Sequence, residues 1–199
     1  IVLKGRDGPI RQEFLSKIPT IFNNLKFQKI YPLVLDSELF GGLDFARTFE
    51  TGKIIKTKGF FNEDNSIIFL SMAERIEASL IGKCTSAMDK NKELCFIASD
   101  EGIDEEKIAD SISERMAFSV CLEGIRYTDI SKILFNLDKI KMGRKSLQSI
   151  PIQDNVIRTL TNMSVKLGID SIRAPILACY AARASAAFSG NNIIKEEDI

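Results

Sequence analysis

The chain has 199 residues, enough for one large domain or for a core with a smaller appendage. Its apolar fraction of 45% and charged fraction of 27% are ordinary for a globular protein. Lysine plus arginine and aspartate plus glutamate each number 27, so no net charge favours nucleic acid or an acidic membrane as a partner. Histidine is absent, which excludes Ser-His-Asp and Cys-His nucleophiles and nearly all zinc chemistry.

Two further absences concern membranes and metal sites. No apolar run approaches the roughly 20 residues of a spanning helix, and no leader pattern opens the chain, so the sequence predicts a protein of the cytoplasm or of an organelle interior. The sequence begins with Ile1, and its last residues, "KEEDI", look like the acidic first turn of another helix. We therefore expect this chain to be a piece of a longer protein. The cysteines, each in an apolar context, are predicted to be buried free thiols rather than disulfide or metal ligands: Cys84, Cys95, Cys121 and Cys179.

Strand-like and helix-like segments alternate as far as Glu123. The predicted strands are 1–4, 29–35, 66–72, 93–99 and 117–122. "SIIFLSM" and "ELCFIAS" are nearly continuous apolar runs, as in strands covered on both faces. "EASLIGKCTSAMDK" (77–90) and "IDEEKIADSISERM" (103–116) predict helices, the second with Asp104 as its N-cap. The pattern indicates an α/β core with a mainly parallel sheet.

After Glu123 the sequence predicts helices only, over 128–143, 152–168 and 171–190. We expect Thr128 to cap the first, Gly143, Gly168 and Gly190 to end them, and Pro175 to lie early in the third. The predicted apolar faces are Ile130, Ile133, Leu134 and Leu137 in the first helix, and Val156, Ile157, Leu160, Met163 and Leu167 in the second. The simplest division is an α/β core over 1–123 and a helical cap over 124–199.

The opening "IVLKGRDGPIRQEFL" reads as a strand, a glycine turn at Gly5 and Gly8, and a helix. A phosphate loop needs G-x-x-x-x-G-K-[ST], whose lysine reaches the outer phosphates and whose hydroxyl holds Mg²⁺. Ile10, Arg11 and Gln12 occupy the last three positions of that pattern. Hydrolysis is therefore not expected. The loop is either a plain strand-to-helix turn or a weak nucleotide site that uses backbone N–H groups at a helix N-terminus.

Six stretches resemble, in order and spacing, the N-terminal AAA+-like module of magnesium chelatase D subunits, over nearly the whole chain. They are "GRDGPIR", "LFGGLDFARTFETGK", "GFFNEDNSIIFLSMAERIEASL", "ASDEGIDEE", "SISERMAFSV" and "SIRAPILACYAARASAAFSG". The resemblance implies an AAA+-like P-loop core with a small all-helical lid. It also implies a subunit of the enzyme that inserts Mg²⁺ into protoporphyrin IX, with ATP, in chlorophyll and bacteriochlorophyll biosynthesis. The linker and integrin-like domain of such subunits are not present here.

The resemblance also assigns site residues. In the family's active I subunit the strand similar to "SIIFLSM" ends in Asp-Glu, where this chain has Ser71 and Met72, with Glu74 displaced. Arg115 stands where AAA+ proteins present an arginine finger to the neighbouring subunit, and Arg173 where a second sensor arginine meets phosphate. Gly5, Gly8 and Arg11 then remain as a degenerate phosphate loop. The structural alternative is that both arginines pair with nearby carboxylates.

Two charged stretches have simpler interpretations. "DEGIDEE" (100–106) is expected to cap a helix or to form a polar inter-subunit edge rather than a metal cluster. "GKIIKTKG" (52–59) is expected to be a solvated loop or an edge strand rather than a nucleic-acid patch.

The resemblance implies a hydrolysis-deficient platform that forms a mixed ring with the ATPase I subunit and couples it to the large porphyrin-binding H subunit. ATP and Mg²⁺ then belong to the complex, with no metal site and no certain nucleotide on this chain. The implied location is the cytoplasm, or the plastid stroma in a plant or alga. The alternatives are an active AAA+ ATPase with unusual ligands and an assembly module that uses no nucleotide.

Overall fold

The computed structural model describes residues 1–22, 25–103, 105–126, 128 and 136–199. The chain divides into two compact units, Ile1–Asp129 and Ile130–Ile199. The predicted division between residues 123 and 124 stays a prediction, because residues next to the boundary lie outside the described ranges.

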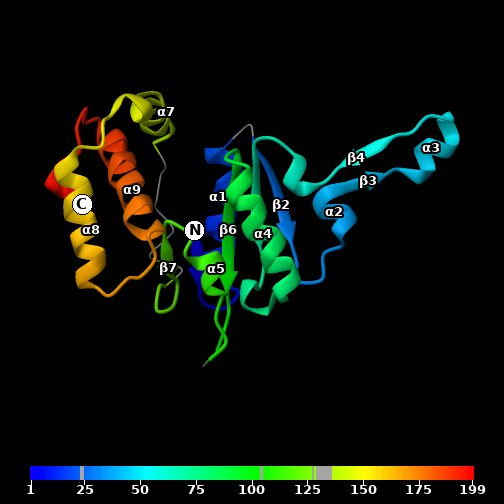
Figure 1. The fold of residues 1–199 in the computed structure, drawn as a ribbon, viewed down its shortest axis with the longest axis horizontal. Coiled ribbons are helices and arrows are strands. Elements are labelled where there is room, and N and C mark those ends of the chain that lie inside the picture. Colours follow the sequence, from blue (N-terminus) through cyan, green and yellow to red (C-terminus); the bar gives the residue numbers. More distant parts are fainter. Residues whose placement is uncertain (23–24, 104, 127, 129–135) are drawn as a thin grey trace. The chain divides into compact units, whose positions relative to one another are not determined.

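The first unit is built on a central sheet (Figure 1). This sheet has five strands in the order β2-β5-β6-β1-β7. Every pair of neighbouring strands in it is parallel, which confirms the predicted sheet. The strands are β1 (Val2–Lys4), β2 (Lys26–Ile30), β5 (Ser66–Leu70), β6 (Leu94–Asp100) and β7 (Ser119–Cys121). Because all five run the same way, their carboxyl ends and the turns that follow lie at one edge of the sheet.

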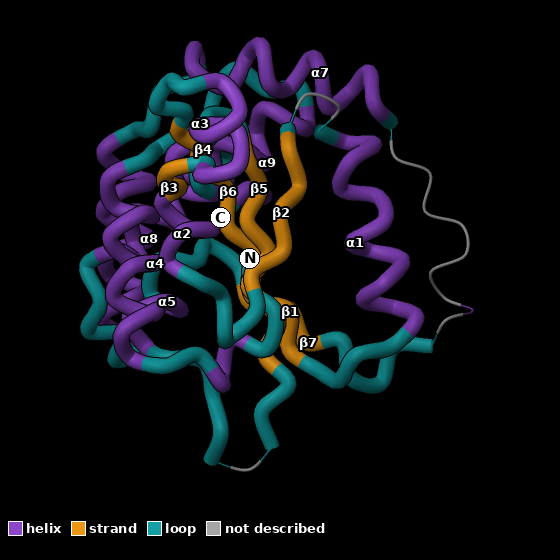
Figure 2. The backbone as a smooth tube through the Cα atoms, turned by 90° about the vertical axis from the view of Figure 1, so that its right-hand side faces the viewer, coloured by secondary structure: helices purple, strands orange, loops and turns teal. Residues whose placement is uncertain are grey.

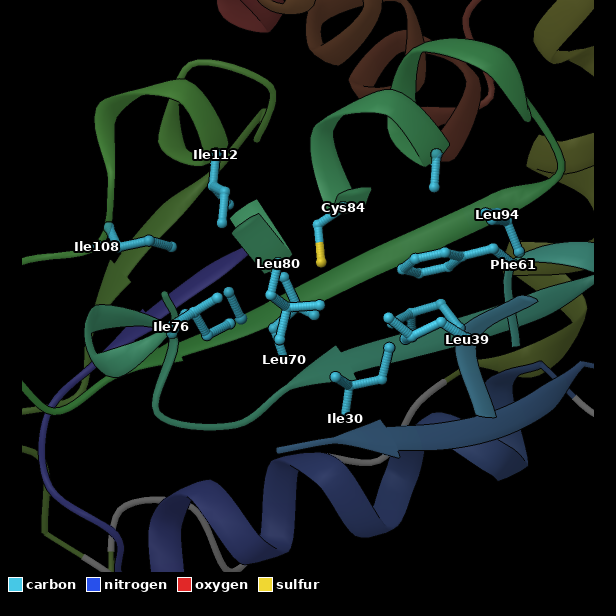
Figure 3. Close-up of a cluster of buried hydrophobic side chains, with 14 of the residues drawn as sticks. Ile30, Leu39, Phe61, Leu70, Ile76, Leu80, Cys84, Leu94, Ile108 and Ile112 are labelled. Atoms are coloured by element: carbon cyan, nitrogen blue, oxygen red, sulfur yellow. The ribbon is translucent and has the colours of Figure 1, made fainter. Parts of the chain in front are cut away.

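Helices cover both faces of this sheet (Figure 2). On one face, α1 (Pro9–Ile21) packs Phe14 and Ile18 against Leu3 and Ile67. On the other face lie α4 (Ala78–Lys90) and α5 (Asp110–Ser113). Their core includes Leu70, Leu80, Cys84 and Ile112 (Figure 3). Coverage from both sides explains why all five residues of β5 are buried and why its sequence is continuously apolar.

Two predicted elements of this unit are wrong in extent. Strand β2 covers Lys26–Ile30 rather than 29–35, because Pro32 cannot donate a ladder hydrogen bond; the chain turns there and enters α2 (Asp36–Phe40). The helix predicted over 103–116 is only α5, and its N-cap is Ala109. Gly102 lies so near Glu106 that a Cβ would overlap its carbonyl oxygen, so the backbone turns tightly here. The acidic stretch therefore does not cap α5, and the predicted cap Asp104 lies outside the described residues.

An arm extends from this core (Figure 1). It consists of β3 (Gly41–Leu43), α3 (Phe45–Thr51) and β4 (Lys56–Lys58), and the two strands pair antiparallel. Helix α3 buries none of its residues. Gly41 has φ +77° and lies against Thr57, so that a Cβ would overlap the Thr57 carbonyl oxygen; glycine is required there. Short 3₁₀ turns follow at Phe60–Asn62 and Ala73–Arg75.

In the described part of the second unit, residues 136–199, the helices α7 (Leu137–Ser146), α8 (Asp154–Lys166) and α9 (Arg173–Ser189) pack together, with 3₁₀ turns at Leu147–Ser149 and Glu196–Asp198. Alanine-rich α9 contacts both other helices. Gly143 does not end its helix: it is buried within α7, where a Cβ would come 3.1 Å from the Ala187 carbonyl oxygen. Gly168 and Gly190, with φ of +66° and +78°, follow α8 and α9 as predicted.

The predicted apolar faces of this unit are only partly correct. In α8, Val156 and Leu160 are buried, whereas Ile157 and Met163 are exposed, as is Leu167 just after the helix. The predicted face over 130–134 lies outside the described residues.

The cysteines also differ from expectation. All four are free thiols, but only Cys84 and Cys179 are buried, while Cys95 and Cys121 are exposed. Burial raises the pKa of the Cys84 thiol to about 12. In the described part of the chain, no helix is both long and apolar enough to cross a bilayer. Within the same residues, no three acidic or thiol side chains gather closely enough to hold a metal ion.

Candidate functional site

The candidate site is the sheet edge where β1, β5 and β6 end, because open parallel sheets bind ligands beyond the carboxyl ends of their strands. Gly5 leaves β1 with φ +130°, a conformation that favours glycine. Its N–H donates to the Asp100 carbonyl oxygen at the end of β6, at 2.9 Å. Gly8 is the N-cap of α1, and Pro9 is the first helical residue. The predicted strand, turn and helix are all present here.

Arg11, at the lysine position of a phosphate loop, is held by the protein itself. Its side chain is 5% exposed, and Nη2 lies 2.8 Å from Glu101 Oε1 and 2.9 Å from Asp7 Oδ1. Nη1 donates to the Gly5 carbonyl oxygen at 3.3 Å. Two carboxylates and a carbonyl therefore surround a cation that would otherwise face a phosphate.

Gln12, at the hydroxyl position, is also engaged in the loop. Its Nε2 donates to Asp7 Oδ1 at 2.9 Å. Burial opposes ionisation of Asp7, but hydrogen bonds from Arg11 and Gln12 outweigh it and lower the pKa of this carboxyl. These residues do not fit Mg-ATP: the loop cation is already neutralised by anions, and Gln12 is a poor substitute for a metal-binding hydroxyl.

The end of β5 lacks the carboxylates of a hydrolytic site. Ser71 is buried and its N–H donates to the Ile30 carbonyl oxygen at 2.9 Å. Met72 has φ +52°, which is unusual for a residue with a side chain. Its N–H donates to Ser99 Oγ at 2.9 Å. Neither side chain can orient Mg²⁺ or an attacking water.

Glu74 lies two residues further along and serves the neighbouring turn. Its side chain is completely buried, and Oε2 accepts a hydrogen bond from the Glu101 N–H at 3.1 Å. Oε1 is 3.3 Å from Arg75 Nε, in a geometry that makes no hydrogen bond. The sequence indicated that Glu74 was displaced, but not that Glu101 connects it to Arg11; the only signal was the acidic run that begins at Asp100.

Arg115 lies between α5 and β7, and its guanidinium is engaged within the unit. Nε and Nη2 donate to the two carboxylate oxygens of Asp89, in the last turn of α4, at 3.0 and 2.7 Å. Nη1 donates to Glu114 Oε1 and to the Ser111 carbonyl oxygen, both at 2.7 Å. The bond to Asp89 raises the pKa of Arg115, against the effect of burial. Adjacent Glu114 is a carboxylate that the sequence places beside Arg115, whereas nothing in the sequence indicates Asp89 as its partner.

Arg173, the predicted sensor, is the first residue of α9 in the second unit. Its N–H donates to Ser171 Oγ at 3.3 Å.

A cavity of about 280 Å³ adjoins the glycine turn and is lined by Gly5, Arg6, Pro9 and Glu123, among others; it lies at the lower limit of small-molecule pockets. A larger one of about 780 Å³ lies over the polar side of α4, beside Phe61 and Lys90, away from the ends of β1 and β6.

Comparison with known proteins identifies relatives of this chain. Residues 157–199 match the AAA lid domain. The chain is 33% identical to the magnesium-chelatase 60 kDa subunit of Cereibacter sphaeroides and 31% identical to that of Rhodobacter capsulatus, in each case over 198 residues and 99% of its length. This chain is a relative of the magnesium-chelatase 60 kDa subunit. It spans about a third of these relatives, 35% of each. The predicted resemblance to a magnesium-chelatase subunit is confirmed.

A solved structure supports the fold independently. A candidate ATPase from Cytophaga hutchinsonii superposes on this chain with a TM-score of 0.72 and 16% sequence identity. The match covers 99% of this chain and 73% of the Cytophaga chain. Identity this low informs on the fold alone. With the lid match, it confirms the predicted AAA+-like core with a helical lid.

Proposed function

We propose that this chain is the AAA+-like module of a magnesium-chelatase subunit and that it does not hydrolyse ATP itself. The observation that carries the proposal is the state of Arg11: its guanidinium is neutralised by Asp7 and Glu101. Ser71 and Met72 supply no carboxylate at the end of β5. Both halves of a hydrolytic site are therefore replaced, although the sheet that would support them is intact.

The function then lies in a complex that inserts Mg²⁺, as substrate, into protoporphyrin IX for chlorophyll or bacteriochlorophyll synthesis. The module acts as a platform in a mixed ring with the ATPase I subunit and transmits its cycle to the porphyrin-binding H subunit. ATP and its Mg²⁺ are held by the partner subunit. The proposed compartment is the cytoplasm, or the plastid stroma in a plant or alga.

Arg115 is proposed as the finger that reaches the partner's nucleotide. An arginine supplied in trans accelerates phosphoryl transfer by roughly 10³–10⁵-fold. Arg115 is bound to Asp89 through two hydrogen bonds. A phosphate of the partner's nucleotide must therefore compete with the Asp89 carboxylate for Arg115 when the subunits dock. Arg173 is proposed as a second arginine toward phosphate.

The first experiment measures ATP hydrolysis by the chain alone and by the I subunit with and without it. We expect no turnover above background alone, and a changed rate for the partner. Turnover that disappears in Arg11→Ala would contradict the proposal, as would a partner ATPase and a chelatase that are indifferent to this module.

The finger is tested with three variants in the reconstituted complex. Arg115→Ala should depress the partner's ATPase, and Arg115→Lys should restore little, because lysine lacks the planar fork. Asp89→Asn is the matched control: it weakens the internal pair but keeps the arginine, so activity should be retained or raised. Equal losses in Arg115→Ala and Asp89→Asn, at equal loss of stability, would indicate a purely structural pair.

A nucleotide-independent assembly module is the second candidate, because an internally neutralised Arg11 leaves little for a nucleotide to bind. Assembly of the mixed ring without ATP, together with unchanged partner turnover in Arg115→Ala, would favour it over the platform with a finger.

A further inference from the structure

Three turns at the sheet edge are joined by a network of polar contacts around Arg11 and Glu101. Arg11 on α1 pairs with Asp7 in the turn after β1 and with Glu101 in the turn after β6, at 2.9 and 2.8 Å. Glu74, after β5, accepts a hydrogen bond from the backbone N–H of Glu101 at 3.1 Å. The network therefore connects the ends of β1, β5 and β6, the three strands that a phosphate loop and its partner strands would bring to a nucleotide.

The anion that Arg11 contacts is a side chain of this protein. In a working loop, the side chain at this position reaches the outer phosphates; here it reaches the carboxylate of Glu101. Carboxylate and phosphate are both recognised by the planar donor fork of arginine. We propose that the Glu101 carboxylate substitutes for the nucleotide's phosphate, so that this sheet edge is held together by an internal ion pair instead of a bound nucleotide.

Burial and charge both oppose replacement of this pair. The side chains of Arg11 and Glu101 are 5% and 19% exposed, so separating them leaves a desolvated charge without its partner. An incoming phosphate would also approach Asp7, Glu101 and the buried Asp100, which repel it.

The inference deepens the proposed function and rests on it, since it explains why a platform of this fold does not require nucleotide. It differs from an ordinary structural salt bridge in one measurable respect. If Glu101 replaces a phosphate, then removing its charge should create a site that responds to added phosphate. A merely structural pair would lose stability and gain no such response.

The experiment uses Glu101→Gln in this chain and follows urea unfolding by circular dichroism with increasing inorganic phosphate at constant ionic strength. Glu13→Gln is the matched control, because Glu13 pairs with Lys17 at 2.9 Å on the same helix as Arg11, with both side chains partly exposed. In Glu101→Gln we expect the unfolding equilibrium constant to rise about tenfold or more. Phosphate should reverse much of that rise, while wild type and control respond only to its general salt effect.

Two further measurements keep the test decisive. The double variant Arg11→Met/Glu101→Gln should lose the phosphate rescue, because the cation is gone. Wild type titrated with Mg-ATP and Mg-ADP should show no binding at millimolar concentration, a result that does not depend on any variant folding.

The inference is overturned if wild type binds nucleotide through Arg11, or if a folded Glu101→Gln gains no phosphate response beyond that of Glu13→Gln. These failures are distinct from failure of the platform role. A platform that binds ATP without hydrolysing it would still alter the partner's turnover, whereas loss of that effect would leave the ion-pair result standing.

Discussion

Substitution of Arg11 by methionine tests how much the first unit depends on this internal pair. Methionine has similar length and similar helix propensity, so α1 itself should be little affected. What changes is the charge: Glu101, with a side chain 19% exposed, loses its cation, and the Gly5 carbonyl loses a donor. Asp7 is 57% exposed and can turn to water, so its share is that of a surface pair.

The expected loss follows from these exposures. Removing one member of a fully buried pair costs about 3–5 kcal/mol, and the exposure of Asp7 reduces this to about 2–4 kcal/mol of unfolding free energy. For a chain of this size the melting temperature should fall by roughly 5–15 °C. The chain has no tryptophan, so urea and thermal unfolding are followed by far-ultraviolet circular dichroism.

Arg47→Met is the control for a charge lost at the surface. Arg47 is 71% exposed and lies 3.7 Å from Asp44 in the arm, so its loss should cost less than about 1 kcal/mol. If Arg11→Met were as stable as Arg47→Met, the buried pair would contribute nothing, and the argument from burial would be refuted.

Three other predictions concern acid stability, thiol reactivity and glycine. The pKa of Asp7 is lowered in the folded protein from an ordinary value of 3.8. The stability that the ionised Asp7 carboxylate contributes is therefore present above pH 3.8 and is lost as pH falls below that value. Urea midpoints measured from about pH 5 to 2 should depend less on pH in Asp7→Asn than in wild type, and an unchanged dependence would contradict this role of Asp7. In the native protein a thiol reagent should label exposed Cys95 within the time that leaves buried Cys84 unlabelled, as measured by mass spectrometry of the peptides; equal labelling would be inconsistent with the fold. Gly41→Ala should destabilise the arm, because Gly41 has φ +77° and a Cβ there would overlap the backbone. Gly82→Ala on α4 has open space around it and should stabilise the chain by about 0.5–1 kcal/mol. Thermal unfolding should show a lower melting temperature for the first variant and a higher one for the second.

The parallel sheet could be predicted because strands that are covered on both faces consist of nearly continuous apolar residues. The segment "SIIFLSM" (66–72) contains β5, which begins at the predicted residue and ends two residues earlier. The limits of β2 and α5 could not, since Pro32 and the tight turn at Gly102 outweighed local pattern. Gly143 was expected to stop a helix and instead permits close approach of α9. A glycine alone does not distinguish these uses.

The sequence shows that the loop from Gly5 to Gln12 departs from the phosphate-loop pattern. It does not show that the charge of Arg11 is neutralised by carboxylates. Arg11 and Glu101 are 90 residues apart, and Arg115 and Asp89 are 26 apart. No local pattern links such residues, because the sheet order brings them together. The sequence therefore indicates the cations but not the distant carboxylates, Glu101 and Asp89, that hold them.

The backbone conformation of Met72 bears on whether the proposed absence of ATP hydrolysis could be reversed. With φ +52° and its N–H on Ser99 Oγ, the backbone at the end of β5 has settled into a left-handed turn that disfavours most side chains. Regaining hydrolysis would require a glycine, lysine and hydroxyl at positions 10–12, carboxylates at 71 and 72, and removal of the Glu101 charge. Each change alone still leaves a ligand missing, so no single step restores hydrolysis. On the proposed function, loss of catalysis in this module is therefore difficult to reverse.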